Sequence, residues 1–234
     1  GVIDIGLEGK MLAGAFSAAA VAHLTGDPWL GVLAAIGTSV MLALVHGFTC
    51  ITHRGNQVIS GLAINMLASA LTITIGIALF RRGGATPSLM GAERIPEINL
   101  PFVETLSVIP ILGPIYAEMI SGHRALVYVA LLAVPLTAWV LYKTRFGLRI
   151  RAVGEAPEAV DSAGLSVYWL RYQAVILAGV LCGIAGAYLS IAHGGEFGKE
   201  MSAGKGYTAL AAVIFGKWRP VPTLFACLLF GFLG

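Results

Sequence analysis

The sequence has few charged side chains for its length. Only 12% of its 234 residues are Asp, Glu, Lys or Arg, while 57% are hydrophobic. A water-soluble domain carries about a quarter charged residues, because polar side chains must cover its surface. The lack of charge therefore argues against an ordinary soluble protein and favours one surrounded by lipid. The net charge is only +3, and the basic residues lie in short loops, so no basic surface for nucleic acid is indicated.

Cysteine and histidine are scarce, and their spacing suits neither disulfides nor metal sites. The three cysteines, Cys50, Cys182 and Cys227, are odd in number and lie in apolar stretches. The five histidines form no i, i+4 pair and do not flank a Glu as zinc hydrolases require. We therefore expect no metal site and no cofactor.

Catalytic motifs are missing as well. Residues 198–206 superficially resemble a phosphate-binding loop, but Gly206 stands where Ser or Thr must hold magnesium. The sequence contains no Gly-x-Ser-x-Gly elbow. We predict that the chain is not an enzyme and that any ATP is bound and hydrolysed by a separate partner subunit.

Long uncharged runs are what the sequence does contain. A membrane-spanning helix needs about 20 apolar residues, and runs of that kind predict spans at residues 29–50, 58–80, 125–142 and 170–192. A further run at 221–234 is shorter, and the first residues lie inside a motif, so we expect the native chain to extend beyond both ends. The fold class predicted for residues 1–234 is a single all-α, polytopic transmembrane helical bundle.

Two apolar segments, at residues 11–22 and 207–215, are too short to cross a membrane, and each follows a Gly-rich polar stretch. Irregular backbone at membrane depth persists only where protein or a wet cavity satisfies its polar groups. We therefore predict short broken or re-entrant helices here, close to a transport path. A truncated span is the alternative for either segment.

Polar and small residues in the apolar runs give further candidates. Asn65 lies inside the run 58–80 and must face protein or water, either as a link between helices or as part of a path. Glu8 either lines a wet vestibule or caps a helix beginning near Gly9. Three glycines share one face of the fourth predicted span and favour close helix packing: Gly179, Gly183 and Gly186.

The polar loop 143–168 indicates both the orientation of the chain and a partner. Four of its residues near the membrane are Lys or Arg, so the positive-inside rule places this loop and residues 51–57 in the cytoplasm and the loop 83–124 on the opposite side. Residues 154–165 predict a short exposed helix, with Pro157 in its first turn and Gly164 at its end. A short helix with a small apolar face suits docking onto another protein.

This loop resembles the coupling segment of ABC-importer permeases, which has the pattern Glu-Ala-Ala, three residues, Gly. The corresponding residues are Glu158, Ala159, Val160 and Gly164, with Val160 replacing the second Ala. Residues 1–16 and 202–220 resemble the nucleoside and simple-sugar branch of the branched-chain amino acid and ribose permease family. Members commonly have Asn where this chain has Asp4.

The resemblance implies an importer with two permease subunits, as a homodimer or heterodimer, two cytoplasmic ATP-binding-cassette ATPase subunits and an external solute-binding protein. It implies a multi-pass protein of the bacterial cytoplasmic (inner) membrane, with ATP bound by the partner subunit. The expected ATPase contacts are Glu155, Glu158, Ala159 and Gly164. The residues expected at the substrate path are Gly6, Glu8, Gly9 and Asn65.

Nucleosides are the first expected substrates and simple sugars the second. A permease for branched-chain amino acids is one alternative. Another is an ion-coupled secondary transporter, which would need ionisable residues inside the spans, where the sequence has essentially none. A structural or assembly membrane protein would leave the two short Gly-preceded segments without a role.

Overall fold

The computed structural model describes residues 2–98 and 122–233. Nearly all regular structure in these residues is helical, and two strands of two residues each pair antiparallel. The predicted all-α class is thus confirmed for the described residues. In chain order the elements are α1 (Leu7–Thr25), α2 (Pro28–Gly47), η1 (Phe48–Thr52), α3 (Gln57–Phe80), η2 (Gly91–Glu93), β1 (Glu97–Ile98), β2 (His123–Arg124), α6 (Ala125–Lys143), α7 (Arg145–Glu155), α8 (Pro157–Ser162), α9 (Val167–Ala187), η4 (Tyr188–Gly194), α10 (Lys205–Phe215) and α11 (Pro220–Leu233).

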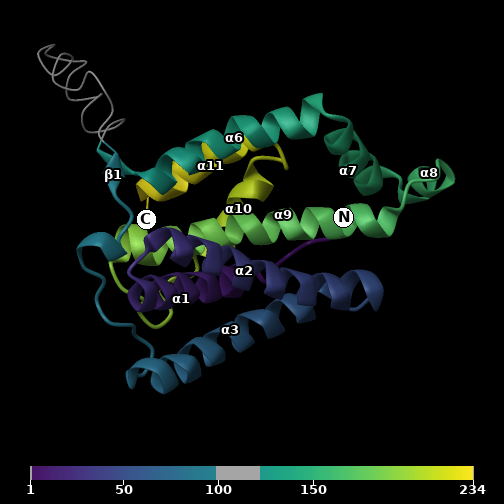
Figure 1. The fold of residues 1–234 in the computed structure, drawn as a ribbon. Helices are drawn as coiled ribbons and strands as arrows, with labels where there is room; N and C mark the ends of the chain where they lie inside the picture. Colours follow the sequence, from purple (N-terminus) through teal and green to yellow (C-terminus); the bar gives the residue numbers. More distant parts are fainter. Residues whose placement is uncertain (1, 99–121, 234) are drawn as a thin grey trace, which may run out of the picture.

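Helices α1, α2 and α9 form the centre of the bundle, with α3 on one side and α6, α10 and α11 on the other (Figure 1). The central helices lie close together because small residues face one another. A Cβ atom added to Gly183 would lie 2.6 Å from Ile36 Cα on α2, and one added to Gly186 would lie 2.4 Å from the Met11 carbonyl oxygen on α1. Gly179 approaches Ala43 of α2 in the same way. These contacts leave no room for larger side chains.

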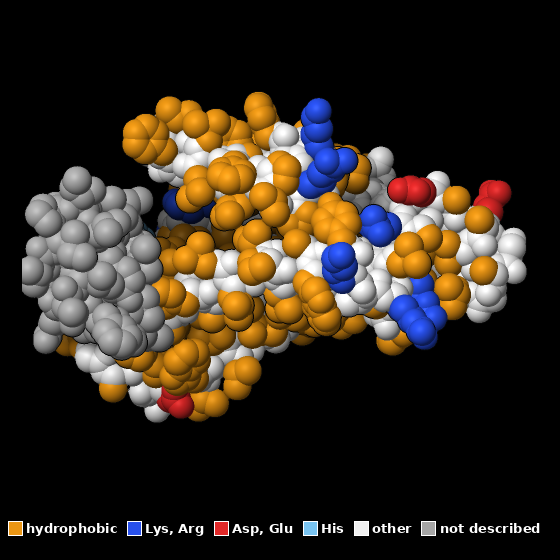
Figure 2. All heavy atoms as spheres, turned by 90° about the horizontal axis from the view of Figure 1, so that it is seen from above, with side chains coloured by type: hydrophobic (Ala, Val, Ile, Leu, Met, Phe, Trp, Pro, Cys, Tyr) orange, Lys and Arg blue, Asp and Glu red, His pale blue; other side chains and the backbone are white. Residues whose placement is uncertain are grey.

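Within the described residues, four helices are long and apolar enough to cross a membrane: Pro28–Thr52, Gln57–Phe80, Ala125–Lys143 and Val167–Gly194. The last of these begins three residues before the run predicted at 170–192 and extends into η4. Hydrophobic side chains are spread over much of the described part of the face seen in Figure 2, as a lipid environment requires.

Helix α1 is longer than the apolar segment 11–22 that it contains. It begins at Leu7 and takes in Glu8 and Lys10, both of which are buried. The charged residues near Gly6 do not end the helix, because other parts of the chain pair with them. The apolar run alone therefore underestimated the length of this helix.

The bundle has two ends, which we call the α8 end and the β1 end after the elements that mark them. The turn from η1 into α3 lies at the α8 end, and η2, β1 and the turn between α1 and α2 lie at the β1 end (Figure 1). The predicted loops 51–57 and 143–168 are therefore on one end. Most of the described part of the loop 83–124 is on the other, and its residues 99–121 lie outside the described residues.

The loop 143–168 is more helical than predicted. The helix expected over 154–165 is two separate helices, since α7 ends at Glu155 and α8 begins at Pro157. Ala156 between them has φ −144° and ψ 78°, because a residue before proline is kept out of the helical region. Helix α7 folds back onto α6 at Gly147, where an added Cβ would lie 2.1 Å from the Val140 carbonyl oxygen.

Candidate functional site

Two helices, α1 and α10, begin inside the bundle instead of at its ends, and Glu8 joins them. Its carboxylate accepts hydrogen bonds from the backbone N–H groups of Gly204 (2.8 Å) and Gly206 (2.6 Å) at the start of α10. The side chain thus supplies negative charge and acceptors where a helix start presents unpaired donors. Of the two roles predicted for Glu8, the structure has a cap, but of α10 and not of the helix near Gly9.

Asn65 connects three segments at the same place. Its side-chain oxygen accepts a hydrogen bond from the Gly9 N–H (2.8 Å), and its amide nitrogen donates to the Ile5 carbonyl (3.2 Å) and to the Tyr207 hydroxyl (2.8 Å). The partners lie in the segment before α1, in α1 itself and in α10. The polar group of α3 is therefore matched at both its donor and its acceptor.

Glycines allow these segments to meet. A Cβ added to Gly9 would lie 2.7 Å from Asn65 Cα, one added to Gly61 would lie 2.8 Å from Gly6 N, and one added to Gly206 would lie 2.6 Å from Glu8 Cα. The structure thus brings together all four residues predicted for the substrate path, Gly6, Glu8, Gly9 and Asn65. Between them is packed backbone, so only the outer edge of this contact can face a solute.

That outer edge carries a polar stripe, which we define as Asn65, Ser69, Tyr207 and Glu200. Ser69 is one turn after Asn65 on α3, and its hydroxyl donates to the Glu200 carboxylate. Tyr207 is 43% exposed, while the neighbouring Met66 is 75% exposed and apolar. Exposed polar groups between apolar ones suit a path for a polar solute better than contact with lipid.

Tyr207 and Glu200 were not singled out from the sequence. Tyr207 is an ordinary member of the apolar segment 207–215, and Glu200 lies in a loop far from Ser69 in sequence. Only the folding of residues 195–204 back into the bundle places them beside α3. The Gly-rich residues that precede 207 were the available signal, and they marked a backbone irregularity without naming its side-chain partners.

A second polar group lies deeper, around Lys10. Lys10 and His46 are both fully buried. The Lys10 ammonium pairs with the Asp4 carboxylate, whose other oxygen lies 3.8 Å from His46 Nε2. His46 Nδ1 is in turn 3.0 Å from the Ser60 hydroxyl. The expectation of essentially no ionisable residue inside the spans was wrong, because His46 lies in Pro28–Thr52.

The residues predicted to contact an ATPase lie together at the α8 end. Glu155, Glu158, Ala159 and Gly164 are all exposed, and Gly164 has a left-handed φ of +78° that ends the α8 turn. Beside them, α7 and α8 form a shallow apolar groove that includes Leu148, Ala152 and Ala159. These residues are free to meet a partner.

The packing of Val160 accounts for the valine that replaces the second alanine of the Glu-Ala-Ala pattern. It is 6% exposed and packs with Val153 of α7 and Leu170 of α9. The side chain thus belongs to a small core that holds α8 against the bundle. A valine at the second alanine position strengthens this attachment, since it buries more apolar area.

Within the described residues, no group of three His, Cys, Asp or Glu side chains could hold a metal ion. What the site offers instead is hydrogen bonding at the polar stripe and a direct connection between two helix starts.

Comparison with known proteins finds a matching family and several similar sequences. The family model described as "Branched-chain amino acid transport system / permease component" matches residues 1–234. A putative glucose ABC transporter permease of Haloferax volcanii is 40% identical over 234 residues, covering 100% of this chain and 68% of the relative. A guanosine ABC transporter permease of Bacillus subtilis is 38% identical, covering 99% and 72%. A nucleoside ABC transporter permease of Lactococcus lactis is 37% identical, covering 99% and 72%. No solved structure matches the chain.

Proposed function

Because the chain belongs to the family of branched-chain amino acid transport system permease components, we propose that it forms the translocation path of an ATP-driven importer for nucleosides or simple sugars. As a permease component it is a multi-pass membrane subunit, and ATP hydrolysis lies in a separate subunit. The substrate class is supported by relatives named for guanosine, nucleosides and glucose. A nucleoside and a sugar share the hydroxyl-rich ring that a path would have to accept.

The observation that carries the proposal is the polar stripe. Its amide, hydroxyl and carboxylate groups can exchange hydrogen bonds with the hydroxyl groups of a solute. Each stripe residue already has a partner within the chain, so a passing solute would be held weakly. Weak contacts suit conduction, because a path that bound its solute tightly would not release it.

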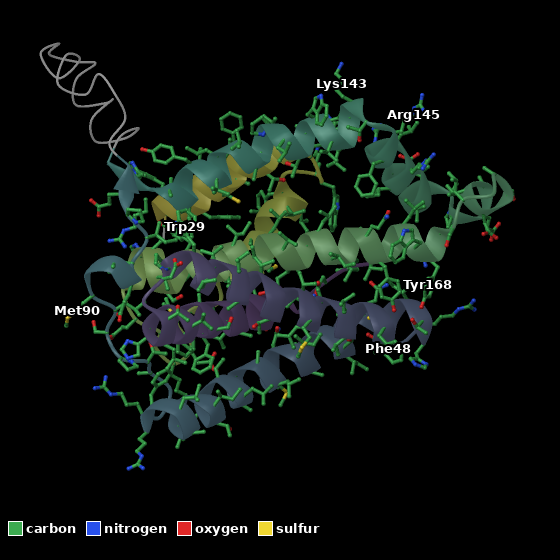
Figure 3. The ribbon with its side chains drawn as sticks, viewed as in Figure 1. Trp29, Phe48, Met90, Lys143, Arg145 and Tyr168 are labelled. Atoms are coloured by element: carbon green, nitrogen blue, oxygen red, sulfur yellow. The ribbon has the colours of Figure 1, made fainter. Side chains whose placement is uncertain are left out.

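The α8 end is the cytoplasmic end in this proposal. Its cations include Lys143 and Arg145, which point away from the bundle in Figure 3, and a cluster of Lys and Arg lies toward this end in Figure 2. Positive charge near the ends of spans favours the cytoplasm. The ATPase would dock at the residues Glu155, Glu158, Ala159 and Gly164 and move α7 and α8 together.

The mechanism we propose is alternating access. Helix α7 is packed onto α6 at Gly147, and α8 is packed onto α9 through Val160. Movement of the ATPase at the α8 end would therefore turn long helices that run the length of the bundle. The contact between α1 and α10 at Glu8 would then move. As it moves, the polar stripe would face first one side of the membrane and then the other.

The proposed assembly contains two permease subunits, two ATPase subunits and an external solute-binding protein in a bacterial cytoplasmic membrane. The second permease is either another copy or a related chain. Mass measurement of the purified complex separates these, since a homodimer contains a single permease sequence.

Uptake into proteoliposomes tests the substrate class. The complex would be reconstituted with its ATPase and binding protein, and uptake of labelled guanosine, glucose and leucine compared. We expect ATP-dependent uptake of guanosine or glucose that persists when an uncoupler is added. Uptake that collapses with the uncoupler and ignores ATP would identify an ion-coupled transporter instead, and leucine uptake alone would identify an amino acid permease.

Charge reversal at α8 tests the coupling role. Glu158→Lys is expected to abolish uptake while leaving membrane insertion intact, because the variant repels the partner surface that Glu158 meets. Arg82→Glu, which reverses an exposed charge after α3 near the opposite end, is the control and should retain uptake. Normal uptake by Glu158→Lys at equal abundance would remove the coupling role.

A further inference from the structure

The Glu200 carboxylate lies beside the middle of a spanning helix. Its hydrogen-bond partner is the hydroxyl of Ser69, the thirteenth of the 24 residues of α3. Glu200 is exposed, and no Lys or Arg within residues 2–98 and 122–233 forms an ion pair with it. A carboxylate at membrane depth is costly unless it meets water or a partner. The exposed side of Glu200 therefore suits a water-filled path and not contact with lipid.

Hydrogen bonds on both sides of Glu200 hold the segment that carries it. On one side the buried Phe197 N–H donates to Thr86 Oγ1 at 2.9 Å, and the Thr86 N–H donates to the Phe197 carbonyl at 3.1 Å. On the other side the Gly204 N–H donates to the Glu8 carboxylate. The Glu200 side chain takes part in none of these bonds. Its position beside α3 is therefore fixed by the rest of the segment.

The backbone of Glu200 has a conformation that residues other than glycine rarely adopt. Its φ is +55°, and Ala203, three residues later, has a φ of +45°. Glycine would adopt this conformation without strain but would supply no carboxylate. Backbone strain of this kind is concentrated at functional sites, where the position of a side chain matters.

The Glu200 carboxylate can accept further hydrogen bonds. Its two oxygens offer about four acceptor sites, and Ser69 uses one of them. Asn65 has less to offer, because its oxygen and its amide nitrogen already bind three groups of the chain. An ionised carboxylate accepts hydrogen bonds and does not donate them, so it favours solutes with hydroxyl donors and repels anions. Two adjacent ring hydroxyls can donate to its two oxygens at once.

We propose that Glu200 is a specificity residue of the translocation path, which accepts hydrogen bonds from two adjacent hydroxyl groups of the passing solute. The inference rests on the proposed function and narrows its substrate class to uncharged solutes with a vicinal diol. Ribonucleosides and glucose both carry such a pair. Hydrogen bonds to an ionised group are stronger than those between neutral groups, so the loss of one hydroxyl is felt more at Glu200 than at Asn65 or Tyr207.

Import rates at saturation test the proposal. The complex would be reconstituted with its ATPase subunits and supplied with a saturating concentration of the solute-loaded binding protein, so that passage through the permease and not capture of the solute sets the rate. The imported solute would be compared with its deoxy analogue, 2′-deoxyguanosine for guanosine or 3-deoxyglucose for glucose. The wild type should import the parent solute about tenfold faster, the lower end of what one hydrogen bond to a charged group contributes.

Glu200→Gln should bring the two rates within about twofold of each other, mainly by slowing the parent solute, because a neutral amide oxygen is a weaker acceptor than a carboxylate. A variant that merely disturbs the fold slows both solutes equally and keeps their ratio. Lys199→Gln is the matched control. Lys199 is the exposed neighbour of Glu200 and lies against Gly84, where an added Cβ would be 2.9 Å from the Lys199 Cβ. This variant should keep the ratio of the wild type.

Equal rates for the parent solute and its deoxy analogue in the wild type would overturn the proposal, whether or not Glu200→Gln folds. An unchanged ratio in Glu200→Gln would overturn it as well. So would equal slowing of both solutes together with loss of the second permease subunit, because the carboxylate would then pair with a cation of that subunit. Failure of the proposed function is seen separately, as a wild-type complex that imports neither guanosine nor glucose.

Discussion

At the scale of single residues, Glu8 connects two helices that lie far apart in the sequence. One carboxylate holds the start of a helix nearly two hundred residues away, with bonds of 2.8 and 2.6 Å. The side chain is 8% exposed, so water cannot replace those bonds if they are lost. The relative position of α1 and α10 depends on this one group.

Glu8→Gln should therefore reduce stability and uptake together. The substitution keeps the shape of the side chain but turns an amide donor toward one of the two backbone N–H groups. We expect a loss of about 1–3 kcal/mol, the range for leaving a buried donor unsatisfied. The measurement is thermal unfolding of the purified protein in detergent, followed by uptake in proteoliposomes.

Glu196→Gln is the control for this substitution, because Glu196 is exposed and its change should leave the unfolding temperature where it was. An equal effect of both substitutions would show that Glu8 is not a special contact.

The Lys10 and Asp4 pair gives a second prediction at this scale. Removing one member of a buried ion pair costs about 3–5 kcal/mol, because the other charge is left without a partner. We therefore expect Lys10→Met and Asp4→Asn each to destabilise the protein strongly. The double variant should lose less than the sum of the two, and a thermal double-mutant cycle measures the difference.

Strict additivity in that cycle would mean that the two side chains do not interact. His46 also contributes to this group of charges, since its Nε2 lies 3.8 Å from Asp4. A His46→Gln variant carried through the same cycle separates its contribution from that of the Lys10 pair.

At the scale of elements, helix positions depend on glycines that face specific neighbours. Gly183 on α9 meets the backbone of α2 so closely that a methyl group would reach 2.6 Å from Ile36 Cα. Gly37 on α2 has open space at its Cβ position. A larger side chain is therefore excluded at one glycine and has room at the other, although the two helices are adjacent.

Gly183→Ala should lower the unfolding temperature, because α2 and α9 must separate to admit the new methyl group. Gly37→Ala should leave it unchanged or raise it, since alanine is favoured over glycine inside a helix by roughly 1 kcal/mol. Thermal unfolding in detergent compares the two variants. A destabilised Gly37→Ala, or a neutral Gly183→Ala, would contradict the packing described here.

The helices themselves were largely predictable from the sequence. Apolar runs at 29–50, 58–80 and 125–142 coincide closely with α2 and η1, α3 and α6. Helix α7 was missed because its sequence, rich in Arg, carries no long apolar run, and what fixes it is contact with α6 at Gly147. Helix α1 was underestimated because Lys10 becomes tolerable only through Asp4, a tertiary pairing that spacing does not reveal.

The candidate site was predictable in part for the same reason. Asn65 and Glu8 are polar residues in or beside apolar segments and could be singled out locally, whereas Gly6 and Gly9 were expected at the substrate path through the resemblance to permeases. Tyr207 and Glu200 are ordinary in sequence and acquire meaning only from the neighbours Asn65 and Ser69. Rules based on neighbouring residues identify side chains whose place in an apolar segment costs free energy. A site also contains residues that are not unusual within their own segments.

At the scale of the whole molecule, the proposed function assigns different tasks to regions that follow one another along one axis. The α8 end carries the exposed short helices, the interior carries the polar stripe, and the β1 end carries η2 and the two short strands. Long helices and the segment 195–204 connect these regions to the contact of Glu8 with α10. A transporter that responds to an ATPase on one side and to a binding protein on the other needs such connections.

This arrangement requires the two ends to face opposite sides of the membrane, which cysteine labelling can measure. Helix α3 has 24 residues and is therefore about 36 Å long, enough to cross a hydrocarbon core of about 30 Å. In a background with Cys50, Cys182 and Cys227 replaced by Ala, we would introduce Arg82→Cys at one end and Glu158→Cys at the other. Both parent positions are exposed, so each thiol can react where the surrounding solution reaches it.

A membrane-impermeant maleimide added to intact cells should label the Cys variant at position 82 and spare the one at 158. Inverted membrane vesicles should give the reverse pattern, and detergent should expose both. The direction follows from the cations Lys143 and Arg145 next to α7, which favour the cytoplasm for the α8 end. Labelling of both variants from the same side would contradict the spanning arrangement, and a simple reversal would place the proposed ATPase contact on the wrong side for import.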